Sequence, residues 1–240
     1  YTDPKFHIRF RFHVPDVSNY GQVFRAIYDC LSPCMENAVI WNVLCDTYQR
    51  EIERYGASSM ELSEHLFCMD SRHMLALLGL LADSQNAEQD RWQLSLRLID
   101  DTLSAFGYTA EDKKELLEKM SAGFKTEFGF TNSTFNKQLN DKFRMQRKNV
   151  ESVFEPETDP VGAYTAILDL RRRETEALAE QILPLTERER IEKDDYVRSV
   201  VHMTMNRLFR SKNRIYEMVI YDFLFRYYQS ALAKIKYAKK

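Results

Sequence analysis

The sequence predicts a mostly α-helical α+β fold, with a small antiparallel sheet near the N-terminus followed by a multi-helix domain. Three observations support this prediction. The 240 residues include only 7 glycines and 6 prolines, too few for the many turns of an all-β protein. Apolar residues recur every three or four positions over most of the chain, as they do on the buried faces of helices. Only the first fifth of the chain contains segments with strand-like alternation or composition.

The clearest predicted strand runs from Lys5 to Val14, where apolar and polar side chains alternate without interruption. Ser18 is suited to cap a helix that ends near Leu31. A second segment, Val39 to Tyr48, is rich in β-branched and aromatic residues, as strands are. The order strand, helix, strand predicts a small sheet backed by one helix.

The rest of the chain is predicted to form helices joined by short loops. Ser58 and Glu61 have the spacing of a capping box, and Asp70 is suited to cap a second helix. Gly107 is expected to end another helix, and Thr109 to begin the next one. Three long helices are expected at about 161–182, 187–209 and 213–236.

Length and composition favour a single domain over residues 1–240. We expect it to be truncated at its N-terminal end, because the chain begins at Tyr1 and enters a predicted strand at once. The longest apolar stretch, Met74 to Leu81, is far shorter than the roughly 20 residues needed to span a membrane. A formal net charge of -2 argues against binding nucleic acid through general basicity.

The cysteines are too few for a disulfide scaffold in a chain of this length, and they lie among apolar residues in the sequence. We therefore expect reduced, buried thiols and a cytoplasmic location. Cys30 and Cys34 could share a helix face, but no paired Cys or His follows at ligand spacing, so no metal site is expected. The four cysteines are Cys30, Cys34, Cys45 and Cys68.

Two arginines mark the polar face of the first predicted strand. Alternate residues of a strand stand about 6–7 Å apart on one face, so Arg9 and Arg11 would be neighbours. Their guanidiniums would suit a carboxylate or phosphate lying between them. The alternative is a solvated face, or pairing with acidic residues of the next strand, and alternation alone favours this alternative.

Two further clusters contain residue types used in catalysis. Arg54 lies in a run of charges of both signs and could reach the same sheet surface, or pair with acidic neighbours in an exposed turn. His202 and Asn206 lie four apart, on one helix face between apolar neighbours. His202 is either a core histidine satisfied by hydrogen bonds or a general acid or base.

Four segments occur along the chain in this order: Tyr1–Arg11, Asp46–Gly56, Glu64–Ser71 and His202–Leu208. Together they resemble the C-terminal elimination domain of class I lanthipeptide dehydratases and its thiopeptide relatives. The resemblance spans nearly the whole chain and is weakest between about residues 85 and 190. The family motif often has a second histidine where this sequence has Thr204, which leaves His202 as the sole imidazole of that motif.

The resemblance implies a lyase that removes glutamate from glutamylated Ser or Thr residues of a ribosomal precursor peptide, leaving dehydroalanine or dehydrobutyrine. It places Arg11, Arg54 and His202 at the family's catalytic positions, with Arg9 and Arg207 as substrate-binding neighbours. No cofactor is expected in this domain, because glutamyl-tRNA is used by a separate glutamylation domain. Expected partners are the precursor peptide and that glutamylation domain, in cis or in trans. A homodimer is compatible with the sequence.

Two other functions remain open at this point. Some thiopeptide relatives use the same fold for a formal cycloaddition that builds a pyridine ring from two dehydroamino acids. A non-catalytic module that binds the precursor peptide through its arginine face is the second alternative. The presence of all three matched catalytic positions favours elimination.

Overall fold

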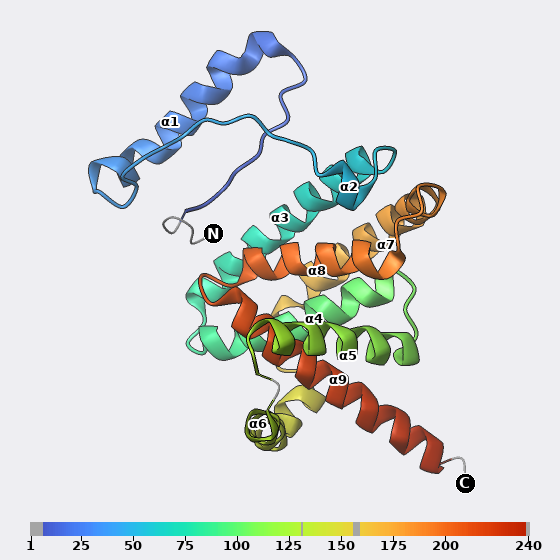
Figure 1. Ribbon diagram of the computed structural model, residues 1–240. Helices are drawn as coiled ribbons and strands as arrows, with labels where there is room; N and C mark the ends of the chain where they lie inside the picture. Colours follow the sequence, from blue (N-terminus) through green and yellow to red (C-terminus); the bar gives the residue numbers. More distant parts are fainter. Residues whose placement is uncertain (1–6, 131, 156–158, 239–240) are drawn as a thin grey trace. The chain divides into compact units, whose positions relative to one another are not determined.

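The structure of the protein, a computed structural model, describes residues 7–130, 132–155 and 159–238. The chain divides into two compact units, Tyr1–Arg50 and Glu51–Lys240. Figure 1 shows one long helix in the first unit and a set of packed helices in the second.

The helix of the first unit is longer than predicted. A short 3-10 turn, η1 (Val17–Asn19), leads into α1 (Tyr20–Glu36), and the Asp16 carboxylate accepts a hydrogen bond from the Ser18 N–H at 2.9 Å. Pro33 lies inside α1 and has no N–H to donate to the carbonyl of Asp29. The Ser32 hydroxyl donates to that carbonyl instead, at 3.4 Å, and the helix continues to Glu36.

The predicted antiparallel sheet is wrong. Among the described residues of the first unit there is no strand, and residues 7–14 and 40–50 have no regular secondary structure. Lys5 and Phe6 of the first predicted strand lie outside the described residues. Local alternation does persist, since the Phe10 and Phe12 rings stack with centroids 6.2 Å apart. Alternation is a local property, however, whereas a strand also needs a neighbour to take up its N–H and C=O groups.

The second unit contains only helices and loops in the part of the chain that is described. The three long helices expected after residue 160 are confirmed, with shifted ends. In chain order the helical elements are α2 (Ile52–Tyr55), α3 (Met60–Asp83), α4 (Ala87–Ala105), α5 (Ala110–Glu127), α6 (Ser133–Ser152), η2 (Gly162–Tyr164), α7 (Thr165–Arg188), α8 (Lys193–Leu208) and α9 (Asn213–Ala238).

Two of the predicted helix boundaries are confirmed, and another is wrong. Gly107 follows α4 with φ +73°, and Thr109 forms a capping box with Asp112 at the start of α5. Ser58 and Asp70 were expected to start two helices, but α3 is continuous from Met60 to Asp83. Asp70 is buried in the middle of this helix, where its carboxylate binds an arginine instead of capping backbone N–H groups.

Helix α4 is central to the core of the second unit and contacts α3, α6, α7, α8 and α9. Its residues Leu94, Leu98 and Leu103 are fully buried, as is Tyr196 of α8. Helix α5 packs along α9, and α3 packs along α7 (Figure 1). None of the described helices is both long and apolar enough to cross a membrane.

The prediction of buried cysteines is wrong. Cys30, Cys45 and Cys68 are exposed and Cys34 is partly buried; all four are free thiols. Cys68 lies between apolar neighbours in sequence, but it points away from the side of α3 that buries Leu66 and Asp70. On a helix, neighbours three or four positions away share a face, whereas adjacent residues do not.

Candidate functional site

Helix α8 presents polar side chains toward two different helices. His202 and Asn206 reach α9, where they contact Glu217 and Asn213. Arg207 turns instead toward α3. The two groups therefore form separate polar clusters in the second unit.

His202 is hydrogen-bonded to a buried carboxylate. Its Nδ1 lies 2.9 Å from Oε2 and 3.0 Å from Oε1 of Glu217, whose side chain is fully buried, whereas the His202 side chain is 29% exposed. The Tyr221 hydroxyl donates to the same Oε2 at 2.8 Å. Burial and the adjacent Glu217 carboxylate raise the pKa of Tyr221 well above its usual range, so this hydroxyl stays protonated and donates.

The other ring nitrogen of His202 faces an amide. Asn206 Nδ2 lies 2.9 Å from His202 Nε2, and Asn213 Nδ2 donates to Asn206 Oδ1 at 3.0 Å. Asn206 follows His202 by one helical turn, as the spacing predicted. The sequence interpretation of a partnered histidine is therefore confirmed, and the exposed part of the ring leaves it accessible for proton transfer.

The second cluster is built around Asp70. Arg171 of α7 donates from Nε to Asp70 Oδ1 at 2.8 Å, and both side chains are buried. Arg207 Nη1 reaches the other oxygen, Oδ2, at 3.1 Å, and its Nε donates to the Ser71 hydroxyl at 3.0 Å. Thr204 also donates to Oδ2, at 3.2 Å. The threonine in place of the family's second histidine thus belongs to a buried ion-pair network.

Tyr55, the residue after Arg54, packs against Phe67, with ring centroids 5.1 Å apart. Burial raises the pKa of Tyr55 to about 12, while the positive charges of Arg54 and Arg207 act in the opposite direction. The Arg207 guanidinium also lies over the Phe67 ring, 5.5 Å from its centroid. Arg54 is half exposed and pairs with Glu51 at 3.2 Å, so the charged-turn alternative is also realised. Tyr55 and Arg207 therefore contact the same ring, that of Phe67.

A carboxylate at the C-terminal end of α7, that of Glu189, holds the turn that follows Arg54. Glu189 accepts hydrogen bonds from the N–H groups of Ala57 and Ser58, at 2.7 Å and 2.6 Å, and from the Ser58 hydroxyl. These hydrogen bonds, first those of Ser58, lower the pKa of Glu189 below its usual value. Gly56, at the start of this turn, has φ +82°.

The hydrogen bonds that Glu189 accepts from Ala57 and Ser58 predict a pH-dependent contribution to stability. Because the folded-state pKa of Glu189 is lowered, its contribution is present above the usual carboxyl pKa and is lost as the pH falls through the lowered value. We expect Glu189→Gln to reduce the urea midpoint of unfolding at about pH 7 and to have little effect at about pH 3. Exposed Glu187, two positions earlier in the last turn of α7, provides the control, Glu187→Gln. An equal decrease of the urea midpoint by Glu189→Gln at both pH values would show that the ionised carboxylate does not stabilise this turn.

The two arginines of the predicted strand belong to the first unit. Arg9 Nε donates to His7 Nε2 at 3.0 Å, and the Arg11 guanidinium lies over the Tyr48 ring, 5.0 Å from its centroid. Both arginines are exposed. Cation–π contact leaves the edge of a guanidinium free to meet an anion. The structure thus places Arg207 on the Phe67 ring, which packs against Tyr55 next to Arg54, and it places His202 on another face of α8.

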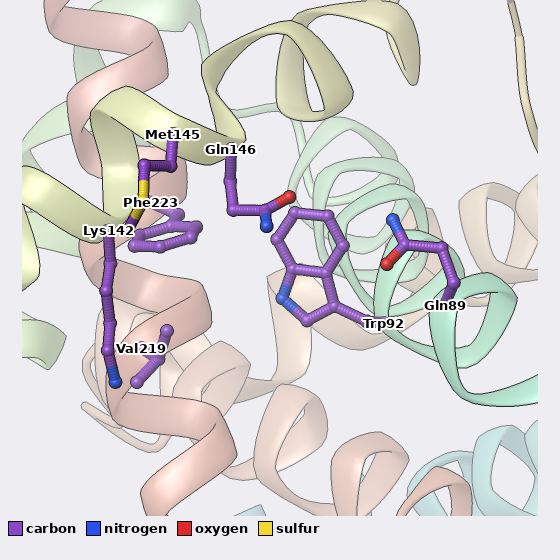
Figure 2. A pocket seen from close by; sticks show the side chains of 7 residues that line it. All are labelled: Gln89, Trp92, Lys142, Met145, Gln146, Val219 and Phe223. Carbon is purple, nitrogen blue, oxygen red and sulfur yellow. The ribbon is translucent and has the colours of Figure 1, made fainter.

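A separate apolar pocket of about 420 Å³ lies between α4, α6 and α9 (Figure 2). None of the predicted site residues lines it. Its side chains are those of Gln89, Trp92, Lys142, Met145, Gln146, Val219 and Phe223.

Comparison with known proteins decides the family. Residues 1–228 match the family described as Lantibiotic biosynthesis dehydratase C-term. The chain belongs to this family. It is similar to the nisin biosynthesis protein NisB of Lactococcus lactis subsp. lactis, with 39% identity over 88 residues, which is 36% of this chain and 8% of NisB. It is also similar to the subtilin biosynthesis protein SpaB of Bacillus subtilis, with 32% identity over 133 residues, 53% of this chain and 12% of SpaB.

These matches confirm the resemblance seen in the sequence. The lantibiotic dehydratase C-terminal chain covers only a small part of each of these relatives. No solved structure matches it significantly.

Several functional-site neighbours in this dehydratase C-terminal chain were not predicted. Glu217 is a lone acidic residue among apolar neighbours of a predicted helix, so its isolation was a usable signal. Asp70 has the same character but suggested a helix cap. Arg171 lies in a run of three arginines, where nothing distinguishes the buried one. Among the described residues, no group of three His, Cys, Asp or Glu side chains is placed to hold a metal ion.

Proposed function

We propose that this chain is a lyase that eliminates glutamate from glutamylated Ser or Thr residues of a ribosomal precursor peptide. Membership of the lantibiotic biosynthesis dehydratase C-terminal family supports the reaction class. The observation that carries the proposal is a partly exposed histidine, His202, whose Nδ1 is anchored by the buried Glu217 carboxylate. Such a pair is suited to moving one proton at a defined place.

The reaction explains the residue types. A base removes the Cα proton, the electron pair of that C–H bond forms the Cα=Cβ double bond, and the Cβ–O bond breaks so that glutamate leaves as a carboxylate. Negative charge develops on the peptide carbonyl oxygen and on the leaving group. Cationic donors held in place before the reaction stabilise that charge. Histidine is therefore suited to transfer the proton, and arginine to stabilise the negative charge.

In the proposed mechanism, His202 handles the proton. Arg54, with Arg207 as a neighbour, holds the glutamyl adduct and the developing negative charge. Arg207 is kept in place by its hydrogen bonds to Ser71 and Asp70. Arg11 shares the catalytic role of Arg54, and Arg9 contributes to substrate binding, on the strength of the family resemblance.

The same proposal includes the partners. The precursor peptide is the substrate, and a glutamylation domain, in cis or in trans, supplies its glutamylated form from glutamyl-tRNA. No cofactor takes part in the elimination itself. We propose that residues 1–240 act as one elimination domain in the cytoplasm, alone or as a homodimer.

The test is glutamate release from a glutamylated peptide. Arg11→Ala, Arg54→Ala and His202→Ala are each expected to lower the rate on the order of 100-fold or more, the usual cost of losing one electrostatic or proton-transferring group. Release is followed by the mass of the peptide and by the free glutamate formed.

Exposed residues of the same types provide matched controls. Arg25→Ala in α1, Arg144→Ala in α6 and His65→Ala in α3 should leave the rate unchanged. Folding of every variant is checked by circular dichroism. If the folded Arg11, Arg54 and His202 variants release glutamate at the parent rate, the assignment is wrong.

The same assay separates the two alternative functions. A cycloaddition enzyme would leave the glutamylated peptide intact and instead convert a peptide with two dehydroalanines. A binding module would bind the precursor without any change in mass, and that binding would survive His202→Ala and be lost with changes at Arg9 or Arg11.

A further inference from the structure

Glu217 occupies an unusual position for a carboxylate. It lies on α9, between apolar residues, and its side chain is fully buried. A buried carboxylate is unfavourable unless hydrogen bonds or an opposite charge compensate it. The imidazole of His202 and the phenol of Tyr221 form hydrogen bonds to it. The His202 imidazole and the Tyr221 phenol are therefore the groups that compensate the burial of this carboxylate.

The hydrogen bonds around His202 have one consistent direction. Asn213 donates to Asn206, and the Asn206 amide donates to His202 Nε2. An ionised carboxylate can only accept, so His202 must donate to Glu217 from Nδ1. Tyr221 stays protonated and donates its own hydrogen to the same carboxylate. The Glu217 carboxylate therefore remains the acceptor for the proton on His202 Nδ1.

We propose that Glu217 is a positioning residue, which keeps a proton on His202 Nδ1 and leaves Nε2 as the nitrogen that accepts the Cα proton. This inference rests on the proposed elimination and deepens it, by assigning His202 the part of the base. The Cα proton transfers to Nε2, where the Asn206 amide must turn or withdraw to make room. The imidazolium that forms has its positive charge next to the Glu217 carboxylate, and it later returns its proton to solvent.

The alternative role, proton donation to the leaving group, needs a proton on Nε2 at the start of the reaction. The Asn206 Nδ2 group faces that nitrogen as a donor, which leaves no room for a second hydrogen between them. Glutamate also leaves as a carboxylate, which needs little protonation at neutral pH. Both points favour His202 as the base.

The first measurement is the tautomer of His202 in the whole chain. Nitrogen-15 NMR of the imidazole rings, with His202→Ala used to assign the signal, should show the neutral ring protonated at Nδ1. In Glu217→Gln, which keeps the size of the side chain but removes its charge, we expect a mixture of tautomers. Glu118→Gln, at an exposed position of α5, should leave the signals unchanged.

The second measurement is turnover of a glutamylated peptide. We expect Glu217→Gln to lower kcat on the order of 100-fold with little change in KM, since a tautomer error affects the chemical step and not the binding of the peptide. Glu217→Asp, which restores the charge, should recover part of that loss. A merely structural role would predict no change in tautomer and no such recovery.

These two measurements distinguish the two proposals. If Glu217 controls the tautomer but no variant, nor the parent chain, releases glutamate, the elimination proposal fails and the positioning role stands. If the parent chain releases glutamate while its neutral His202 is protonated at Nε2, the positioning role is overturned. The tautomer is read from the parent chain, so the inference can be tested even if Glu217→Gln does not fold.

Discussion

Replacing Asp70 by asparagine is expected to lower the free energy of unfolding by about 3–5 kcal/mol, the cost of leaving a buried charge without its partner. Arg171 is 2% exposed, and Asp70 is its carboxylate partner. Its Nη1 has no hydrogen-bond partner among the described atoms, so the Asp70 carboxylate carries much of its compensation. Asparagine has the same shape as aspartate, and the change therefore reports on charge and not on packing.

The measurement is urea-induced unfolding of the Asp70→Asn variant. The matched control is Asp83→Asn, at the exposed C-terminal end of the same helix, which should shift stability by less than about 0.5 kcal/mol. Equal stabilities of the two variants would mean that the Asp70–Arg171 pair does not stabilise the second unit.

Replacing Gly56 by alanine is expected to destabilise the chain through two additive effects. The positive φ of +82° costs about 1–3 kcal/mol for a residue with a Cβ. The new Cβ would also stand 2.6 Å from Glu189 Oε2 and 2.9 Å from the Ile191 side chain, and forcing such an overlap costs roughly 1–3 kcal/mol. Because Arg54 lies two residues earlier, glutamate release should fall together with stability.

Gly79 provides the contrasting control for this prediction. It lies in the exposed part of α3, and a Cβ built there meets no atom within 4 Å. Gly79→Ala should therefore stabilise the chain by about 0.5–1 kcal/mol, the gain in helix propensity. Thermal unfolding of both variants gives the comparison, and a Gly56→Ala protein as stable as the parent would show that the turn can relax.

The sequence is sufficient to predict the long helices because their periodicity is local and repeated. Thr109 and Gly107 mark helix ends through chemistry confined to a few residues, and both predictions are confirmed. The segment Lys5 to Val14 has the alternation of a strand, but pairing is decided by a second segment that alternation cannot supply. The prediction of a sheet is wrong for this reason, although the rings of Phe10 and Phe12 are stacked.

For the site, motifs indicated individual residues but not their partners. The spacing of His202 and Asn206 on one helix face is confirmed as a contact. Glu217 lies on a different helix, and only the packing of α8 on α9 brings its carboxylate to the ring. Asp70 was assigned to a helix cap because short-range rules cannot recognise a partner 101 positions away in the sequence. The catalytic roles of Arg11 and Arg54 stay predictions.

The carboxylate of Asp70 divides its two oxygens between a buried arginine, Arg171, and a partly exposed one, Arg207. This shared acceptor has a consequence for how the sequence can vary over evolution. Loss of Asp70 would leave the buried Arg171 without its carboxylate partner, whereas loss of either arginine would leave the other one paired with Asp70. Position 70 is therefore constrained by two arginines from two other helices, whereas each arginine position can vary as long as the other arginine keeps the carboxylate paired.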